Sequence, residues 1–221
     1  MVDLLALCAH PDDLEVCAGG LFLLAKQQGL TTGLIILTDG AASGRASAKE
    51  RRAEALAAAK ILELDFFEHL NFPDAALQAN QHTIDQVLPV LAKASPRHIL
   101  TLHPEDYHPD HIAASHIAQT AAFTAGLPRH SQTGEDWHYE NLFFFAADPR
   151  TAKARPELLF DITQVMEQKL QACKAHASQD VLPYARAMSS SLGMLAGVPY
   201  AEGLYLHKVL KVHHLSALFA K

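Results

Sequence analysis

The chain has 221 residues, of which 49% are hydrophobic and 19% are charged, and its formal net charge is −6. This composition is typical of a folded globular chain and argues against intrinsic disorder. The negative charge, in a sequence without a basic stripe, argues against a general nucleic-acid-binding function.

Hydrophobic periodicity predicts alternating strands and helices, because near-continuous apolar runs indicate buried strands and apolar residues at helical spacing indicate helices. In chain order, the predicted elements are strand 2–8, helix 14–28, strand 34–38, helix 49–62, strand 66–70, helix 84–94, strand 99–102, helix 110–124, strand 142–147, helices 162–176 and 182–195, and strand 204–212, which could form an antiparallel edge. This alternation predicts one α/β domain over residues 1–221, Rossmann-like, with a mostly parallel sheet between two helical layers. The polar residues 126–141 predict a long surface loop, of the kind that often forms a lid or substrate loop.

Two short polar motifs carry most of the chemistry in this sequence. Residues 9–15 read A-H-P-D-D-L-E and follow the first predicted strand, and residues 108–111 read H-P-D-H and follow the strand at 99–102. Ligands of open α/β sheets bind at the carboxyl ends of the strands, so we expect both motifs to contribute to one site. The first strand–helix turn lacks a G-x-G-x-x-G pattern, and its carboxylates argue against a dinucleotide phosphate there.

The residue types in these motifs predict a metal centre. His10 and Asp13 are three residues apart, a spacing that can direct both side chains to one side of a turn, and His111 can supply a third ligand. Two imidazoles and one carboxylate with an open coordination position suit a catalytic zinc ion, and the same set suits non-haem iron. Asp12 then remains beside the metal as a candidate general base for a water molecule.

The second motif adds His108 and Asp110 to the candidate catalytic residues. His108 can donate a proton or stabilise an oxyanion, and Asp110 can orient its imidazole. A simpler alternative is that Asp12, Asp13 or Asp110 caps the helix that follows. Capping needs one aspartate per helix, however, and the two motifs carry more histidines and aspartates than that, which favours a shared metal site.

These motifs resemble those of the PIG-L-type (LmbE-like) zinc N-deacetylases, and the resemblance covers most of the chain. The matching segments beyond the two motifs are R-x-x-E-A at 51–55, P-D-x-x-L at 73–77, Lys169 with H-A-S-Q at 176–179, and Y-A-E-G at 200–203. The resemblance implies hydrolysis of an N-acetyl group on an N-acetylglucosamine moiety. It also implies zinc held by His10, Asp13 and His111, with Asp12 as the general base and His108 as the group that polarises or protonates.

Within this family, residues 111–127 look most like the deacetylases of bacillithiol synthesis, which act on N-acetylglucosaminyl malate. Such relatives often carry arginine immediately before the second motif, where this chain has Tyr107. We expect Arg51, Tyr107 and Tyr200 to contact the substrate. For Arg51 the alternative interpretation is a solvated charge on its helix.

Three functions follow from these patterns. The first is a zinc-dependent amidohydrolase acting on a small amino-sugar substrate. The second is a non-haem iron enzyme with the same ligands, which leaves Asp12 and His108 without roles, and the third is a non-catalytic metal- or sugar-binding module on the same fold. Three cysteines without CxxC spacing favour a reducing cytoplasm. No signal-peptide pattern or run of ~20 apolar residues appears, so we expect no membrane partner, and the family resemblance predicts a homo-oligomer.

Overall fold

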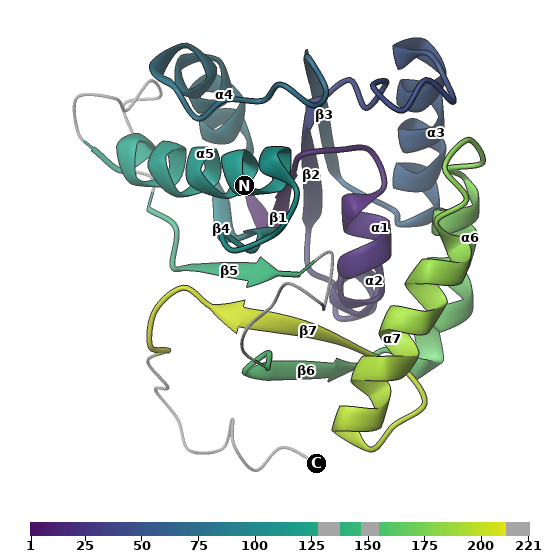
Figure 1. The fold of residues 1–221 in the computed structure, drawn as a ribbon. Coiled ribbons are helices and arrows are strands. Elements are labelled where there is room, and N and C mark those ends of the chain that lie inside the picture. Colours follow the sequence, from purple (N-terminus) through teal and green to yellow (C-terminus); the bar gives the residue numbers. More distant parts are fainter. Residues whose placement is uncertain (128–137, 147–154, 211–221) are drawn as a thin grey trace.

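The computed structural model describes residues 1–127, 138–146 and 155–210. Within this part of the chain, seven strands form one sheet in the order β3-β2-β1-β4-β5-β7-β6 (Figure 1). The strands are β1 (Val2–Cys8), β2 (Thr32–Thr38), β3 (Phe66–Phe72), β4 (Pro96–Leu102), β5 (Asn141–Phe145), β6 (Leu158–Asp161) and β7 (Ala201–Leu206). Strands β3, β2, β1, β4 and β5 are parallel to one another, and β7 is antiparallel to both of its neighbours, β5 and β6. The predicted α/β class with a mostly parallel sheet is confirmed.

Helices cover both faces of the sheet (Figure 1). They are α1 (Asp13–Cys17), α2 (Gly19–Gln27), α3 (Ala48–Ile61), α4 (Gln81–Ala94), α5 (Pro109–Ala125), α6 (Met166–Lys174) and α7 (Leu182–Ala196), with a short 3-10 turn at Thr163–Val165 before α6. One layer consists of α4 packed on α5, and in the other layer α6 contacts α1, α2, α3 and α7. The molecule therefore has the three-layer arrangement that the alternating pattern predicts.

The starts of two helices follow from local sequence. Ser47 accepts a hydrogen bond from the backbone N–H of Glu50, whose carboxylate in turn accepts from the backbone N–H of Ser47, and this capping box begins α3. Pro109 occupies the first turn of α5, where no backbone donor is required. The residue before it, His108, caps α5, because its Nδ1 accepts the backbone N–H of Asp110 at 3.2 Å. A candidate catalytic residue is thus held by the helix that follows it.

The predicted helix over residues 14–28 is interrupted at Ala18, whose backbone leaves the helical region (φ −145°, ψ 13°). The interruption leaves backbone groups of α1 and α2 without helical partners, and two buried side chains replace them. Lys169 Nζ donates to Val16 O at 2.8 Å. Glu202 accepts the backbone N–H groups of Gly20 and Leu21 at 2.9 and 2.6 Å, and it pairs with Lys169 Nζ at 2.6 Å. The break is therefore supported by residues from α6 and β7.

Two further expectations for the sheet need correction. The four-residue strand β6 was not predicted, and it occupies the sheet edge beside β7, so the last predicted strand is antiparallel but not an edge strand. That strand runs over Ala201–Leu206 rather than 204–212, and residues 211–212 lie outside the described part of the chain. Most of the predicted loop at 126–141, and residue 147 of the strand predicted at 142–147, also lie outside it. None of the described helices is both long enough and apolar enough to cross a membrane.

Candidate functional site

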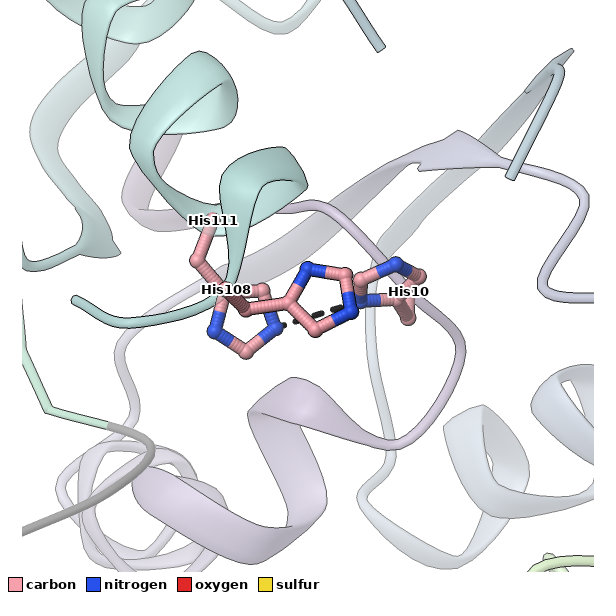
Figure 2. A group of neighbouring side chains, drawn as sticks. All are labelled: His10, His108 and His111. Carbon is pink, nitrogen blue, oxygen red and sulfur yellow. Dashed lines mark hydrogen bonds between the residues drawn. The ribbon is translucent and has the colours of Figure 1, made fainter. Parts of the chain in front are cut away.

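The two polar motifs meet because β1 and β4 are neighbouring parallel strands in register, with Leu7 opposite Thr101. The chain winds outward in opposite directions from these two strands, which makes the β1–β4 junction the topological switch point where such sheets bind ligands. Figure 2 shows His10 directed toward His108 and His111, which come from the start of α5. The expectation of one shared cluster is confirmed.

The three predicted metal ligands have donor atoms close to one another. His10 Nδ1 lies 3.2 Å from His111 Nε2. Asp13 places Oδ1 3.4 Å from His111 Nε2 and Oδ2 3.7 Å from His10 Nδ1. Donors around a tetrahedral zinc ion, with bonds of about 2.0–2.2 Å, are separated by roughly 3.3 Å. The spacing of the two imidazole nitrogens therefore fits one small cation, with the Asp13 carboxylate beside them, and the types of the three groups fit zinc or iron.

Carboxylates lie behind both imidazoles. His10 Nε2 is 3.0 Å from Asp74 Oδ1 and 3.3 Å from Asp110 Oδ2, and His111 Nδ1 is 3.2 Å from Asp106 Oδ1. A neutral imidazole has one N–H and one lone pair, so a carboxylate at one nitrogen leaves the other nitrogen as the ligand. This assigns His10 Nδ1 and His111 Nε2 to the metal, the two atoms that face each other.

The donor atoms also permit other groupings. His10, His108 and His111 form one set close enough to hold a metal ion, and His10, Asp74 and Asp110 form a second. The second set is less suited to an ion, because occupying it would require His10 Nε2 to give up its proton between the carboxylates of Asp74 and Asp110.

The expected role of Asp110 needs correction. Its carboxylate does not contact the His108 ring; it accepts backbone N–H groups of Ala75 and Leu77 at 2.7 and 3.1 Å and faces His10. The group that orients His108 is the backbone N–H of Asp110. Capping is also not the role of these aspartates, because Asp12 makes no side-chain cap bond and α5 is capped by His108.

The carboxylates give the cluster a field that favours positive charge. Burial by itself lowers the pKa of His10, but the nearby carboxylates of Asp110, Asp13 and Asp74 outweigh burial and raise this pKa to about 12. In His111 burial again lowers the pKa, and the nearby carboxylates of Asp13 and Asp106 raise it to about 9. A divalent cation between the two rings would satisfy the same carboxylates, so the residues present fit a bound metal.

Asp12 has a left-handed backbone conformation. Its φ is +106°, in a region that side chains other than glycine seldom adopt. Strained residues of this kind occur at functional sites, where surrounding contacts hold them. The Asp12 carboxylate lies 3.0 Å from Arg51 Nη2. Burial raises the pKa of Asp12, and the charge of Arg51 opposes that rise.

Arg51 is 2% exposed, so the interpretation of a solvated helix charge is wrong. Its guanidinium donates to the carbonyls of Gly40 and Pro11 as well as to Asp12. Gly40 is required for this approach, because a Cβ there would lie 2.6 Å from Pro11 Cδ and 3.1 Å from Arg51 Nε.

A pocket of about 300 Å³ opens beside the cluster. Its walls are His10, Asp12, Gly40, Ala42, Ser43, Arg51, Asp74, Ala75, His108 and Gln179. Tyr107 is 61% exposed, with its ring centre 6.1 Å from that of His108, so it stands next to this pocket rather than in its wall. Tyr200 is absent from the described pocket wall, and its hydroxyl accepts a bond from Arg186. The structure therefore places Arg51 at the pocket, Tyr107 beside it, and Tyr200 elsewhere.

Four residues of this site had no individual role in the sequence interpretation. Asp74 and Asp106 contact the two ligand imidazoles, and Gln179 forms part of the pocket wall. His176 is buried with Nε2 3.5 Å from Glu15 Oε2, and burial of this imidazole is outweighed by the Glu15 charge, which raises the pKa of His176. The segments at 73–77 and 176–179 were noticed only as family matches, and Asp106 stands outside every motif.

The fold and the clustered side chains define an α/β protein with a candidate His/Asp metal site at the switch point of its sheet. The model of the family described as GlcNAc-PI de-N-acetylase (PIG-L) matches residues 5–122, which include both motifs. The chain belongs to the PIG-L family. The match to the family model does not distinguish the bacillithiol branch of that family.

Similar proteins cover nearly the whole chain. Diacetylchitobiose deacetylase from Thermococcus kodakarensis is 30% identical over 88% of this chain and 79% of its own length. The conserved protein TT1542 from Thermus thermophilus is 35% identical, with a TM-score of 0.87 over 96% of this chain and 98% of that one. GalB, the 4-carboxy-2-hydroxymuconate hydratase from Pseudomonas putida, is 25% identical, with a TM-score of 0.88 over 97% of this chain and 100% of that one.

Proposed function

We propose that this protein is a zinc-dependent hydrolase that removes the N-acetyl group from a small molecule containing N-acetylglucosamine. The observation that carries the proposal is that Asp12 and His108 line the same pocket as His10. His10 belongs to every candidate set of metal ligands described above. Amide hydrolysis needs a base for water and a donor for the developing charge or the departing amine, and this pocket offers both beside a metal site. The likeness to a diacetylchitobiose deacetylase supports the choice of an acetylated amino sugar.

His10, Asp13 and His111 would hold the ion. A bound zinc supplies Lewis-acid polarisation of the amide carbonyl and lowers the pKa of water. Asp12 takes a proton from the attacking water, and its carboxylate is held in place for this by Arg51. The water oxygen bonds to the amide carbon, the C–N bond breaks, and the departing nitrogen takes the proton held by Asp12, so the products are the free amine and acetate.

His108 supports the reaction as a hydrogen-bond donor. Its Nδ1 accepts the backbone N–H of Asp110, so the ring proton of the neutral form sits on Nε2. Burial is the largest cause that lowers the pKa of His108, and the charges of the neighbouring His10 and His111 lower it further. We therefore assign it the neutral form, with Nε2–H directed to the oxygen or nitrogen of the scissile amide.

The aglycone is the finer part of the proposal. N-acetylglucosaminyl malate and diacetylchitobiose differ in charge, and the exposed Tyr107 beside the pocket offers an aromatic face rather than a positive charge. Aromatic faces pack well against the apolar faces of sugar rings. We therefore favour a neutral sugar over malate as the group attached to the N-acetylglucosamine unit that reacts.

A hydratase is the second candidate, because the GalB hydratase shares the fold over the whole chain at 25% identity. Both activities use a base and a proton donor, so their products must distinguish them.

The experiment is an acetate-release screen of the zinc-loaded protein with diacetylchitobiose, N-acetylglucosaminyl malate and N-acetylglucosamine, beside an absorbance assay with an unsaturated dicarboxylate. Acetate release that is lost in Asp12→Asn supports the proposal. Absorbance loss without acetate would identify a hydratase, and inactivity in both assays with zinc bound would favour a binding module. Zinc and iron contents of protein purified without added metal separate the hydrolase from the iron alternative.

A further inference from the structure

The side chain of Arg51 has almost no hydrogen-bonding capacity left for a substrate. A guanidinium carries five N–H donors. Nε donates to Gly40 O at 3.1 Å, Nη2 donates to Pro11 O and to Asp12 Oδ2, and Nη1 donates to Glu54 Oε2 at 3.4 Å. These contacts use four of the five donors.

Glu54 is held from the opposite side by the connection between α6 and α7. Its Oε1 accepts the backbone N–H of Ser178 at 2.8 Å, and its Oε2 accepts the Ser178 hydroxyl at 2.7 Å. The Glu54 side chain is 16% exposed and that of Arg51 is 3% exposed, so solvent screens this pair only weakly. A continuous chain of contacts thus runs from Ser178 through Glu54 and Arg51 to Asp12.

The far end of this chain is the strained residue. Asp12 has φ +106° and no cap bond of its own, so other contacts must supply the free energy that keeps it there. Arg51 donates to the carbonyl that precedes Asp12 and to the Asp12 carboxylate, which ties the backbone and the side chain of this turn to one planar group.

We propose that Arg51, Glu54 and Ser178 form a clamp that holds Asp12 in its productive conformation, with Arg51 as the positioning residue and the other two acting through it. This inference rests on the proposed function, in which Asp12 takes a proton from water. It replaces the expectation that Arg51 contacts the substrate. Ser178 lies next to Gln179 of the pocket wall, so one short connection both shapes the pocket and holds the clamp.

The kinetic test uses zinc-loaded protein and acetate release. Glu54→Gln removes the charge that holds Arg51 Nη1, and we expect kcat to fall about tenfold with KM changed by less than about twofold. Ser178→Ala keeps the backbone donor, so we expect a loss of about threefold, restored by Ser178→Thr. Glu63→Gln and Ser191→Ala, both exposed and outside the pocket, are the matched controls.

Two results of this test would overturn the clamp. In an Arg51→Met background, Glu54→Gln should cause no further fall in kcat, because the cationic partner of Glu54 is already gone; a second tenfold fall would show that Glu54 does not act through Arg51. In the Arg51 variant, a rise in KM for an anionic substrate, with KM for a neutral substrate unchanged, would show that Arg51 binds substrate charge.

A second readout does not depend on turnover. In metal-free protein, the Nη1–H of Arg51 that donates to Glu54 should give an NMR signal protected from solvent exchange, and Glu54→Gln should abolish that protection while Glu63→Gln leaves it intact. Retained protection in Glu54→Gln contradicts the clamp even if no substrate releases acetate. If protection is lost but no substrate releases acetate, the clamp is supported and only the proposed function is contradicted.

Discussion

Asp106 Oδ1 lies 3.2 Å from His111 Nδ1, and this contact determines which nitrogen of His111 faces His10 and Asp13. The same Asp106 oxygen accepts the backbone N–H of His108 at 3.0 Å. One buried carboxylate therefore orients a candidate metal ligand and places the backbone of a candidate catalytic residue.

Replacing Asp106 tests this orientation. We expect Asp106→Ala to weaken zinc binding about 10–100-fold, the usual cost of losing a partner of a metal-ligating histidine. Asp106→Asn keeps an acceptor oxygen, so its loss should be smaller. The measurement is the zinc Kd by competition with a chelator, with Glu105→Gln, an exposed neighbour, as the control. An Asp106→Ala variant that binds zinc like the parent would show that His111 needs no support.

The division between ligand and base predicts different metal contents. Asp13→Ala and His111→Ala should lose most of the bound zinc, because each removes one of three donors. Asp12→Asn should keep zinc and lose turnover, because its carboxylate contacts Arg51 rather than the facing imidazole nitrogens. Metal analysis by mass spectrometry on dialysed protein measures this. Equal zinc loss in Asp12→Asn contradicts the assignment of roles.

The buried pair of Lys169 and Glu202 predicts a large loss of stability on single substitution. Lys169→Met leaves the Glu202 charge buried without its partner, and such losses typically cost about 3–5 kcal/mol. Lys26→Met, which breaks an exposed pair with Asp65, should cost about 0–1 kcal/mol. Urea unfolding gives both free energies. Similar values for the two variants would mean that the internal pair does not support the break between α1 and α2.

His176 predicts a pH dependence of stability. Its pKa is raised in the folded protein, because the charge of Glu15 outweighs burial. The stability from this pair is therefore fully present below the unfolded pKa of about 6.5 and is lost as pH rises through the folded pKa. The difference in unfolding free energy between the parent and His176→Gln, measured with a chelator present, should shrink from pH 5 to pH 9. A constant difference would show that His176 does not gain a proton on folding.

Much of the site was predictable because its residues are adjacent in sequence to predictable strands. The apolar runs at 2–8 and 99–102 predicted β1 and β4, and adjacency of the two motifs followed from the rule for parallel sheets. The candidate donors His10, Asp13 and His111 followed from residue type and spacing, and the structure brings them close together. Sequence patterns of this kind report what each strand end carries.

The supporting contacts were not predictable, because they join residues far apart in the chain that have no local signature. Asp106 is a single aspartate in a turn, which is a common composition for any loop. Asp110 appeared to belong to His108, its neighbour in sequence, whereas its carboxylate reaches His10, 100 positions away. Arg51 was ambiguous because a helical arginine is usually solvated, and only the fold shows that Gly40 and Pro11 enclose it.

The split between α1 and α2 has a consequence for the order of folding. The first N–H groups of α2 find their acceptor in Glu202, whose partners Gly20 and Leu21 are 182 and 181 positions away. Contacts at such separation form late, since their loop-closure entropy must first be offset by other structure. During synthesis, the segment that follows the first motif therefore stays incomplete until β7 has left the ribosome. The candidate metal-binding turn before α1 therefore matures only after β7 has been made.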